Sequence, residues 1–395
     1  MALFSGRRNH KNIAVFDLGT SSVNGFWVRA FKDGSAEIAA STRAELKMLE
    51  NPDFRNMWRY LKDALLLAVS NLKKNVRPRE IDFVFVVFSS PWYLSQTRIV
   101  QMKRPRKFVI AKKLLEDLVF EEIEIFKKKS QEKFSLPAAE LEVLEHDIMK
   151  VVLNGYEVKD PIKKEARELV VALYASIFRK ETLEEFRDIF EYEFGRAPVK
   201  ITSSPLALFN VLKDAVSPEE GFVLADVGGE ITEISLIRHH IIEEVVTFAR
   251  GGHFVVRRLA SGLGVGLEDA FSFIRSKTRS ELKGSLDERV SAILNDAGKA
   301  WYELFFQALS EIGKDNPLPQ TLILLGGASG IEALKKESES PELARFTILG
   351  RPFSVLTLLP EAFTEKISSS GIDRKDPQMT LPLLLVLGAV KNAWQ

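Results

Sequence analysis

Two aspartates in this chain each follow an apolar run and precede a turn of small residues, a pattern suited to phosphate and metal chemistry. Asp17 lies within residues 12–28 (NIAVFDLGTSSVNGFWV), and Asp226 lies far along the chain within residues 221–237 (GFVLADVGGEITEISLI). In both segments a second apolar run follows the turn, which predicts strand, tight turn and strand with the acid at the tip. A carboxylate there can hold Mg²⁺ through its water ligands. We therefore expect Asp17 and Asp226 to be the metal-binding residues.

The residues of the two turns are the candidate phosphate-binding residues. Most are small or carry a hydroxyl group, so their backbone N–H groups can surround phosphate oxygens. They are Gly19, Thr20, Ser21 and Ser22 in the first turn, and Gly228, Gly229, Glu230 and Thr232 in the second. Two such turns could close on a phosphate chain from opposite sides.

A third segment supplies what a nucleotide site still lacks. Residues 322–325 form an apolar run that predicts a buried strand, and residues 328–336 read as the start of a helix. The two glycines between them have no Cβ atom, so a flat ring could approach the backbone. The candidate residues here are Gly326, Gly327, Ala328 and Ser329. Any one of the three segments fits an ordinary hairpin or strand-to-helix turn, whereas all three together, in this order and spacing, indicate a site for a nucleotide and a metal ion.

Bulk composition places the chain among water-soluble globular proteins and excludes several functions. It has 395 residues, enough for two or three domains, with 46% apolar and 28% charged residues. A net charge of +1 gives no general attraction to nucleic acid, and no aromatic platform for bases is evident. Cysteine is absent, which favours a reducing compartment. With no signal peptide and no apolar stretch of about 20 residues, we expect a cytoplasmic protein, with peripheral contact to the inner face of the membrane as an option.

The order of predicted elements indicates two similar halves with one insertion. The first half opens as three strands, a helix over residues 56–73 and a strand buried on both faces over residues 81–89. The second half repeats this plan from the second aspartate hairpin onward. The predicted boundaries are 1–90 and 167–202 for the first lobe, 91–166 for an inserted α+β unit, 203–250 and 318–395 for the second lobe, and 251–317 for a helical subdomain of that lobe.

In this order and spacing, the three glycine-bearing segments resemble the phosphate-1, phosphate-2 and adenosine motifs of the actin/Hsp70/sugar-kinase ATPase superfamily. The resemblance implies an α/β class, an actin-like two-lobed ATPase fold of duplicated ribonuclease H-like domains, with ATP and Mg²⁺ bound between the lobes. The α+β unit at 91–166 looks like the SHS2 (1C) subdomain of the FtsA family of bacterial cell-division proteins and of its relative PilM from type IV pilus assembly. Residues 153–161, 203–230 and 249–270 are also similar to FtsA.

The chain departs from the FtsA pattern at several positions. Where the phosphate-2 motif of the family reads Asp-Ile-Gly-Gly-Gly-Thr-Thr-Asp, this chain has Glu230 for the third glycine, Ile231 for a threonine and Glu233 for the second aspartate. The Glu230 carboxylate would weaken phosphate binding unless Mg²⁺ compensates for it or the side chain turns away. Ser204 replaces the glutamate with which Hsp70-like ATPases position water, and no catalytic residue is identified. FtsA chains end in an amphipathic membrane helix, and nothing like it precedes Gln395.

The resemblance implies an FtsA-like protein that binds ATP, assembles with itself and links division filaments to a membrane-protein complex. One alternative is a PilM-like adaptor that binds the cytoplasmic tail of a pilus membrane protein, and another is an actin-fold scaffold without nucleotide. We expect slow hydrolysis at most, since no strong general base is visible. Residues 103–113 hold six Lys or Arg and no acid, which is ordinarily a solvated face and alternatively a contact to an anionic membrane or an acidic partner.

Overall fold

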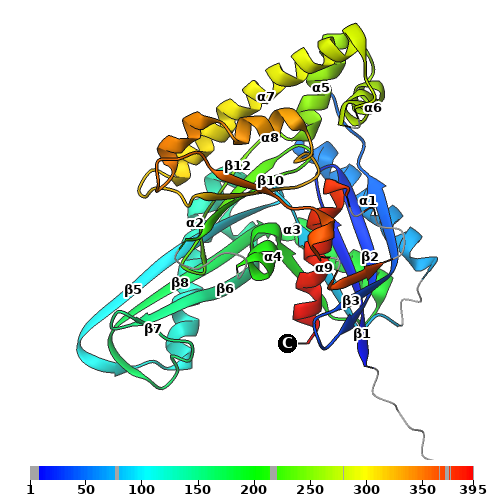
Figure 1. The fold of residues 1–395 in the computed structure, drawn as a ribbon. Helices are drawn as coiled ribbons and strands as arrows, with labels where there is room; N and C mark the ends of the chain where they lie inside the picture. The colour runs from blue at the N-terminus through cyan, green and yellow to red at the C-terminus, as the bar shows by residue number, and fades with distance from the viewer. Residues whose placement is uncertain are drawn as a thin grey trace, which may run out of the picture.

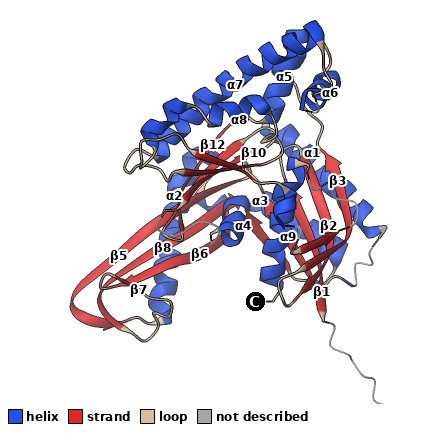
Figure 2. Cartoon of the chain, in the orientation of Figure 1, coloured by secondary structure: helices blue, strands red, loops and turns tan. Residues whose placement is uncertain are grey.

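The computed structural model describes residues 9–75, 80–213, 220–278, 280–363, 365–369, 373 and 375–394. Within these residues the chain forms three sheets of six, five and four strands with helices packed against them (Figures 1 and 2). Two of the sheets repeat one topology, and the third forms an arm that projects from the body. None of the helices in these residues is long and apolar enough to cross a lipid bilayer.

The first lobe is built on a sheet with the order β15-β3-β2-β1-β4-β9. Strands β1, β2 and β3 form an antiparallel meander, and β4 and β9 continue the sheet parallel to β1. Helices α1 and α3 bury one face of this sheet in an aromatic-rich core. The bounds are β1 His10–Leu18, β2 Ser22–Phe31, β3 Ala36–Glu45, α1 Phe54–Lys73, β4 Phe83–Phe88, α3 Lys180–Phe194 and β9 Val199–Ser203.

The second lobe repeats the same strand arrangement in the order β12-β11-β10-β13-β14. Three antiparallel strands are again followed by two parallel ones, which confirms the predicted duplication of the fold. The long helix α7 is continuous and packs with α5 and α8 over one face of the sheet. The bounds are β10 Phe222–Val227, β11 Thr232–Arg238, β12 Ile241–Phe248, α5 Gly252–Leu263, α6 Leu267–Thr278, α7 Gly284–Ile312, β13 Thr321–Leu325, α8 Glu332–Ser338 and β14 Ser354–Thr357.

The arm is an antiparallel sheet in the order β5-β8-β6-β7, with α2 packed on one face (Figure 1). Its bounds are β5 Tyr93–Val109, α2 Lys112–Phe134, β6 Leu141–Leu153, β7 Tyr156–Glu157 and β8 Glu165–Arg179. The predicted boundary at residue 166 falls inside β8, which runs without interruption from the far end of the arm into α3. Strand β8 therefore ties the arm to the first lobe.

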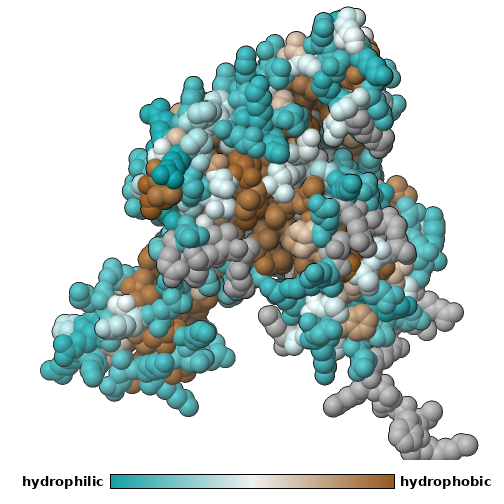
Figure 3. Space-filling model, viewed as in Figure 1, coloured by the Kyte–Doolittle hydropathy of each residue, from teal (hydrophilic) through white to brown (hydrophobic). Residues whose placement is uncertain are grey.

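Two helices lie between the lobes and share their apolar faces with both sheets. These are α4 (Ser204–Leu212) and α9 (Thr380–Ala393), which pack together with residues of β1, β2, β10 and β13 in one core. On the surface, the space-filling view shows hydrophobic side chains gathered at the centre of this face of the molecule (Figure 3). The last short strand, β15 (Ile367–Ser369), pairs with β3 of the first sheet. The end of the described chain thus packs on the first lobe and brings the start of α9 close to the first hairpin.

Candidate nucleotide-binding site

The turns of the two aspartate hairpins have matching backbone geometry. In the β1–β2 turn the Gly19 N–H donates to the Ser22 carbonyl at 3.1 Å, and in the β10–β11 turn the Gly228 N–H donates to the Ile231 carbonyl at 2.9 Å. The aspartate stands two residues before the glycine in both cases. The duplication of the lobes therefore extends to the individual hydrogen bonds of these turns.

The two turns touch each other directly. The Glu230 N–H donates to the Thr20 hydroxyl at 3.0 Å, a buried bond that crosses between the lobes. A Cβ atom on Gly229 would lie 2.7 Å from the Cβ of Ser21, so only glycine allows this approach. Groups that would bind phosphate oxygens are therefore bonded to one another in this conformation.

The third glycine segment packs against the second aspartate. Strand β13 runs parallel to β10 with Leu325 opposite Asp226. Gly326 has a φ of +95°, and a Cβ there would lie 2.3 Å from Asp226 Oδ1, so the position demands glycine. The predicted helix begins later than expected, since residues 326–330 form a bend and turns and α8 begins at Glu332.

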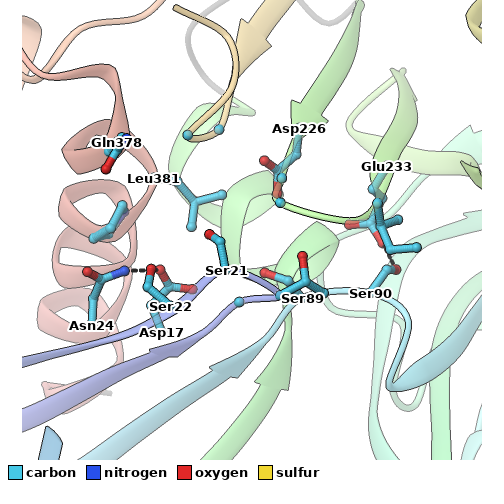
Figure 4. A pocket seen from close by; sticks show the side chains of 18 of the residues that line it. Asp17, Ser21, Ser22, Asn24, Ser89, Ser90, Asp226, Glu233, Gln378 and Leu381 are labelled. Atoms are coloured by element: carbon cyan, nitrogen blue, oxygen red, sulfur yellow. Dashed lines mark hydrogen bonds between the residues drawn. The ribbon is translucent and has the colours of Figure 1, made fainter. Parts of the chain in front are cut away.

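A small cavity lies where the three segments meet (Figure 4). Its volume is about 60 Å³, far below the roughly 300–1,000 Å³ of pockets that hold small molecules. Ten of the predicted site residues line it, namely Asp17, Gly19, Thr20, Ser21, Ser22, Asp226, Gly228, Gly229, Gly326 and Gly327. This conformation brings those residues together and leaves room for a few water molecules but not for a nucleotide.

Four predicted site residues lie outside the cavity lining. Thr232 accepts from Trp301 Nε1 at 3.0 Å and donates to the Arg250 carbonyl at 2.7 Å, so it packs within the second lobe. Ser329 donates to the Gly326 carbonyl at 2.8 Å, and Ala328 is buried in the core of the same lobe. The fourth, Glu230, turns toward α5.

Glu230 pairs with two residues of α5. Its carboxylate accepts from both terminal guanidinium nitrogens of Arg257, Nη1 at 2.9 Å and Nη2 at 2.6 Å, and lies 2.9 Å from His253 Nδ1. Burial would raise its pKa, but the hydrogen bonds from Arg257 and His253 outweigh burial and lower the pKa to about 2. Arg257 also donates to the Leu49 carbonyl at 3.1 Å and so connects the second lobe to the first. The sequence allowed two possibilities, compensation of the Glu230 charge by Mg²⁺ or a side chain that turns away from the phosphates. The structure has the side chain turned away from the cavity.

Other cavity residues were not foreseen from the sequence. Ser89 and Ser90 follow the end of β4, and the carboxyl ends of parallel strands are the usual ligand-binding edge, a signal that was available. Asn24 and Arg43 come from β2 and β3, next to the first aspartate. Leu381 and Pro382 come from the start of α9, and Gln378 comes from the short 3-10 helix Pro377–Met379 just before it. No local signal marks these three residues, because only the packing of this last segment brings them to the cavity.

The cavity contains an excess of buried acid. Burial raises the pKa of Asp17 to about 6, against the lowering effects of the Asn24 hydrogen bond at 3.0 Å and of Arg43. The pKa of Asp226 is raised well above its ordinary value by burial and by the negative charges of the nearby Glu233 and Asp17. Burial likewise raises the pKa of Glu233 to about 7, although Ser90 and Tyr93 donate hydrogen bonds to it. Ionised carboxylates here are costly unless a cation joins them.

The residues present fit Mg²⁺ held largely by water and phosphate. Asp17 Oδ1 is buried and has no hydrogen-bond partner, so it is available as an oxygen ligand. No three His, Asp or Glu side chains converge as a ligand set in the described part of the chain. Mg²⁺ characteristically binds through one or two carboxylates, with water and phosphate oxygens completing its shell.

Comparison with known proteins identifies the fold. No protein-family model and no curated protein matches the sequence. Among solved structures, the PilM–PilN type IV pilus biogenesis complex is similar with a TM-score of 0.64 at 16% identity, over 96% of this chain and 98% of that chain. The MamK double helical filament (TM-score 0.48, 12% identity, 98% and 99% coverage) and the ethanolamine utilization protein EutJ from Carboxydothermus hydrogenoformans (TM-score 0.47, 12% identity, 95% and 88% coverage) are more distant. The chain has the mixed α/β, actin-like ATPase fold that its motifs predicted.

Proposed function

We propose that this protein binds ATP with Mg²⁺ between its two lobes and uses the nucleotide to set how far the lobes close. The observation that carries the proposal is the meeting of two equivalent Asp-x-Gly turns, one from each lobe, beside Gly326, a position next to Asp226 where only glycine fits. In an actin-like fold this is where a phosphate chain would lie.

The residues of the turns have defined tasks in this proposal. When the lobes part, the Glu230 N–H and the Thr20 hydroxyl exchange their mutual bond for bonds to phosphate oxygens. The Arg257 guanidinium keeps the Glu230 carboxylate away from the phosphates. Bound Mg²⁺ would supply the positive charge that the phosphates and the buried aspartates share.

Binding is tested by thermal unfolding with and without Mg-ATP. Ligand that binds only the folded state stabilises it, by about 2.7 kcal/mol at 100 times the Kd, so the melting temperature should rise by a few degrees. Asp17→Asn should remove that rise. Because burial raises the pKa of Asp17 to about 6, its ionised form costs stability above that pH, so the ligand-free variant should be at least as stable at pH 8.

Asp33→Asn is the matched control, since Asp33 lies in an exposed hairpin turn of the same lobe. It should keep the full response to Mg-ATP. If the unaltered protein shows no response at millimolar Mg-ATP, the scaffold without nucleotide replaces this proposal. The direct bond between the turns and the closed cavity are the observations that favour that rival.

For the biological role we propose an actin-fold adaptor that binds a cytoplasmic segment of a membrane-protein complex. The support is the end-to-end similarity of fold to PilM in its complex with PilN. The second candidate is the FtsA-like filament protein, favoured by the local similarity of residues 203–270. Sedimentation with Mg-ATP separates them, because filaments pellet whereas an adaptor stays small, and neighbouring division or pilus genes give an independent answer.

A further inference from the structure

Cations gather at the far end of the arm from two separate parts of the sequence. Residues 103–113 contribute six Lys or Arg, and residues 156–168 contribute four more. The fold joins these segments, because Lys103 lies opposite Glu168 on β8, and Ile110 exchanges backbone hydrogen bonds with Lys163 and Lys164 at 2.8 Å. With four acids in the second segment, the arm end carries a charge of +6, whereas the whole chain carries only +1.

Few of these cations are neutralised. Of the ten, only Lys112 has an ion-pair partner among the described residues, Glu116 at 3.5 Å, and both side chains are exposed. The basic residues of the arm end are exposed to solvent, and Figure 3 shows the end of the arm, at the lower left, mainly in the colour of hydrophilic residues. The arm end is therefore a concentrated positive surface on a nearly neutral molecule.

Apolar side chains protrude among the cations. Val109 is 53% exposed, Ile162 is 40% exposed and Tyr156 is 78% exposed. Each belongs to the same two segments as the cations. If the arm end served only to keep the protein soluble, exposing these apolar side chains would bring no benefit. Aliphatic and tyrosine side chains are, however, stabilised at the boundary between lipid headgroups and acyl chains.

Helix α2 begins at this end with unfavourable electrostatics. Its N-cap residue Ala111 makes no side-chain capping bond, its first turn holds no acid, and it starts with Lys112 and Lys113. The N-terminus of a helix carries partial positive charge, so lysines there are destabilising unless an anion lies nearby. An anionic surface beside the arm end would relieve this repulsion.

We infer that the end of the arm is a docking surface for an anionic lipid bilayer. The cations are attracted to the headgroup phosphates, and Val109, Ile162 and Tyr156 enter the interface. The geometry allows this contact, because the 15 residues of β8 at about 3.3 Å each carry the arm end roughly 50 Å along the strand, clear of the lobes (Figure 1). The contact does not require nucleotide, so it stands or falls separately from the proposed function.

The aliphatic residues favour a bilayer over nucleic acid. Duplex DNA binds proteins mainly through phosphate and sugar contacts, which the lysines could make but to which protruding Val109 and Ile162 add nothing. In a bilayer the same two residues strengthen the contact made by the cations. Duplex DNA and an acidic polypeptide are therefore comparison probes in the test.

The test is co-sedimentation of the full chain with phosphatidylcholine vesicles that contain or lack phosphatidylglycerol. We expect binding only with phosphatidylglycerol, and its loss at an ionic strength of about 1 M, where the Debye length is about 3 Å. Lys107→Ala/Lys159→Ala/Lys164→Ala should weaken binding about a hundredfold, since each cation near an anionic surface contributes about fivefold. Val109→Ser/Ile162→Ser, which keeps every cation, should weaken it several-fold.

The matched control removes three exposed lysines from the C-terminal end of α2, as Lys128→Ala/Lys129→Ala/Lys133→Ala. It should bind like the unaltered protein, and both lysine variants should keep its melting temperature because the replaced side chains are exposed. Equal binding to neutral vesicles, or equal losses in both triple variants, would overturn the inference. So would tighter binding to duplex DNA or polyglutamate than to the anionic vesicles.

Discussion

Glu230 illustrates how a tight turn between two lobes can carry a carboxylate side chain beside two glycines. The side chain leaves the cavity and pairs with Arg257, while its backbone N–H still faces the opposite turn. One residue thus contributes both to the turn and to its attachment to α5. The backbone N–H of Glu230 is the group that faces the opposite turn, and the pairing of its side chain with Arg257 helps to fix the position of that backbone.

The pKa of Glu230 leads to a prediction about acid unfolding. Its folded pKa of about 2 lies below the ordinary 4.5, so its stabilising contribution is complete above pH 4.5 and is lost as the pH falls toward 2. Glu230→Gln should therefore lower the free energy of unfolding at pH 7 by about 2 kcal/mol, with partial solvent screening allowed for. The free energy of unfolding of this variant should also fall less steeply as the pH is lowered from 4.5 toward 2. Urea unfolding at a series of pH values measures both effects.

Glu37→Gln serves as the comparison, because Glu37 forms a half-exposed ion pair with Arg29 at 2.6 Å. Its loss should cost under about 1 kcal/mol. Equal costs for the two variants would mean that the Arg257 pair contributes no more than a surface pair.

At the scale of elements, a partly buried carboxylate fixes the arm to the first lobe. Glu145 of β6 accepts from the backbone N–H of Ser203 at 2.9 Å, from the hydroxyls of Ser203 and Thr202, and from Ser176 at 3.1 Å. Burial raises its pKa despite these hydrogen bonds. The arm is therefore joined to β9 by directional bonds as well as by the continuous strand β8.

Removing the Glu145 carboxylate should loosen the attachment of the arm without affecting nucleotide binding. Glu145→Ala leaves several buried donors without a partner and should cost about 2–4 kcal/mol of folding stability. Hydrogen exchange should rise along β6 and β9, while the thermal response to Mg-ATP stays. Glu142→Ala, on the same strand but in a partly exposed pair with Arg187, should cost much less. Loss of the Mg-ATP response would place the arm within the nucleotide site.

At the scale of the whole molecule, the central question is how the lobes open. The cavity of about 60 Å³ is too small for ATP, and bonds from Thr20 to Glu230 and from Arg257 to Leu49 connect the lobes across it. A ligand shifts the equilibrium between closed and open lobes toward the open form only if it binds the open form more tightly. The proposed function therefore requires a change in the distance between the lobes.

That change can be measured by spin labels, because the chain has no native cysteine. Ser70→Cys on α1 and Ser272→Cys on α6 are exposed positions in different lobes. Mg-ATP should shift the distance distribution between these labels, and the same protein carrying Asp17→Asn should not respond. Two labels within the first lobe, at Ser70 and Asp33, should show no shift. A distribution unchanged by saturating Mg-ATP would contradict control of lobe closure by nucleotide.

Much of the fold could be predicted from the sequence, because hydrophobic periodicity and turn residues are local signals. The Asp17 and Asp226 hairpins, the strand before Gly326 and the duplicated order of elements all carry such signals. The glycines were recognisable because close backbone approach excludes every other residue type, as at Gly326. By itself, then, the sequence determined the class of fold and most residues that line the cavity.

Tertiary structure alone decided which side chains complete the cavity and which leave it. Leu381 of α9 enters it because the last helix packs between the lobes, and Glu230 leaves it because Arg257, 27 positions away, provides its partner. The arm-end surface likewise exists only because β8 brings Lys164 beside Ile110. Contacts between residues distant in the chain depend on how whole elements pack, and that packing is a property of the folded molecule that no local pattern encodes.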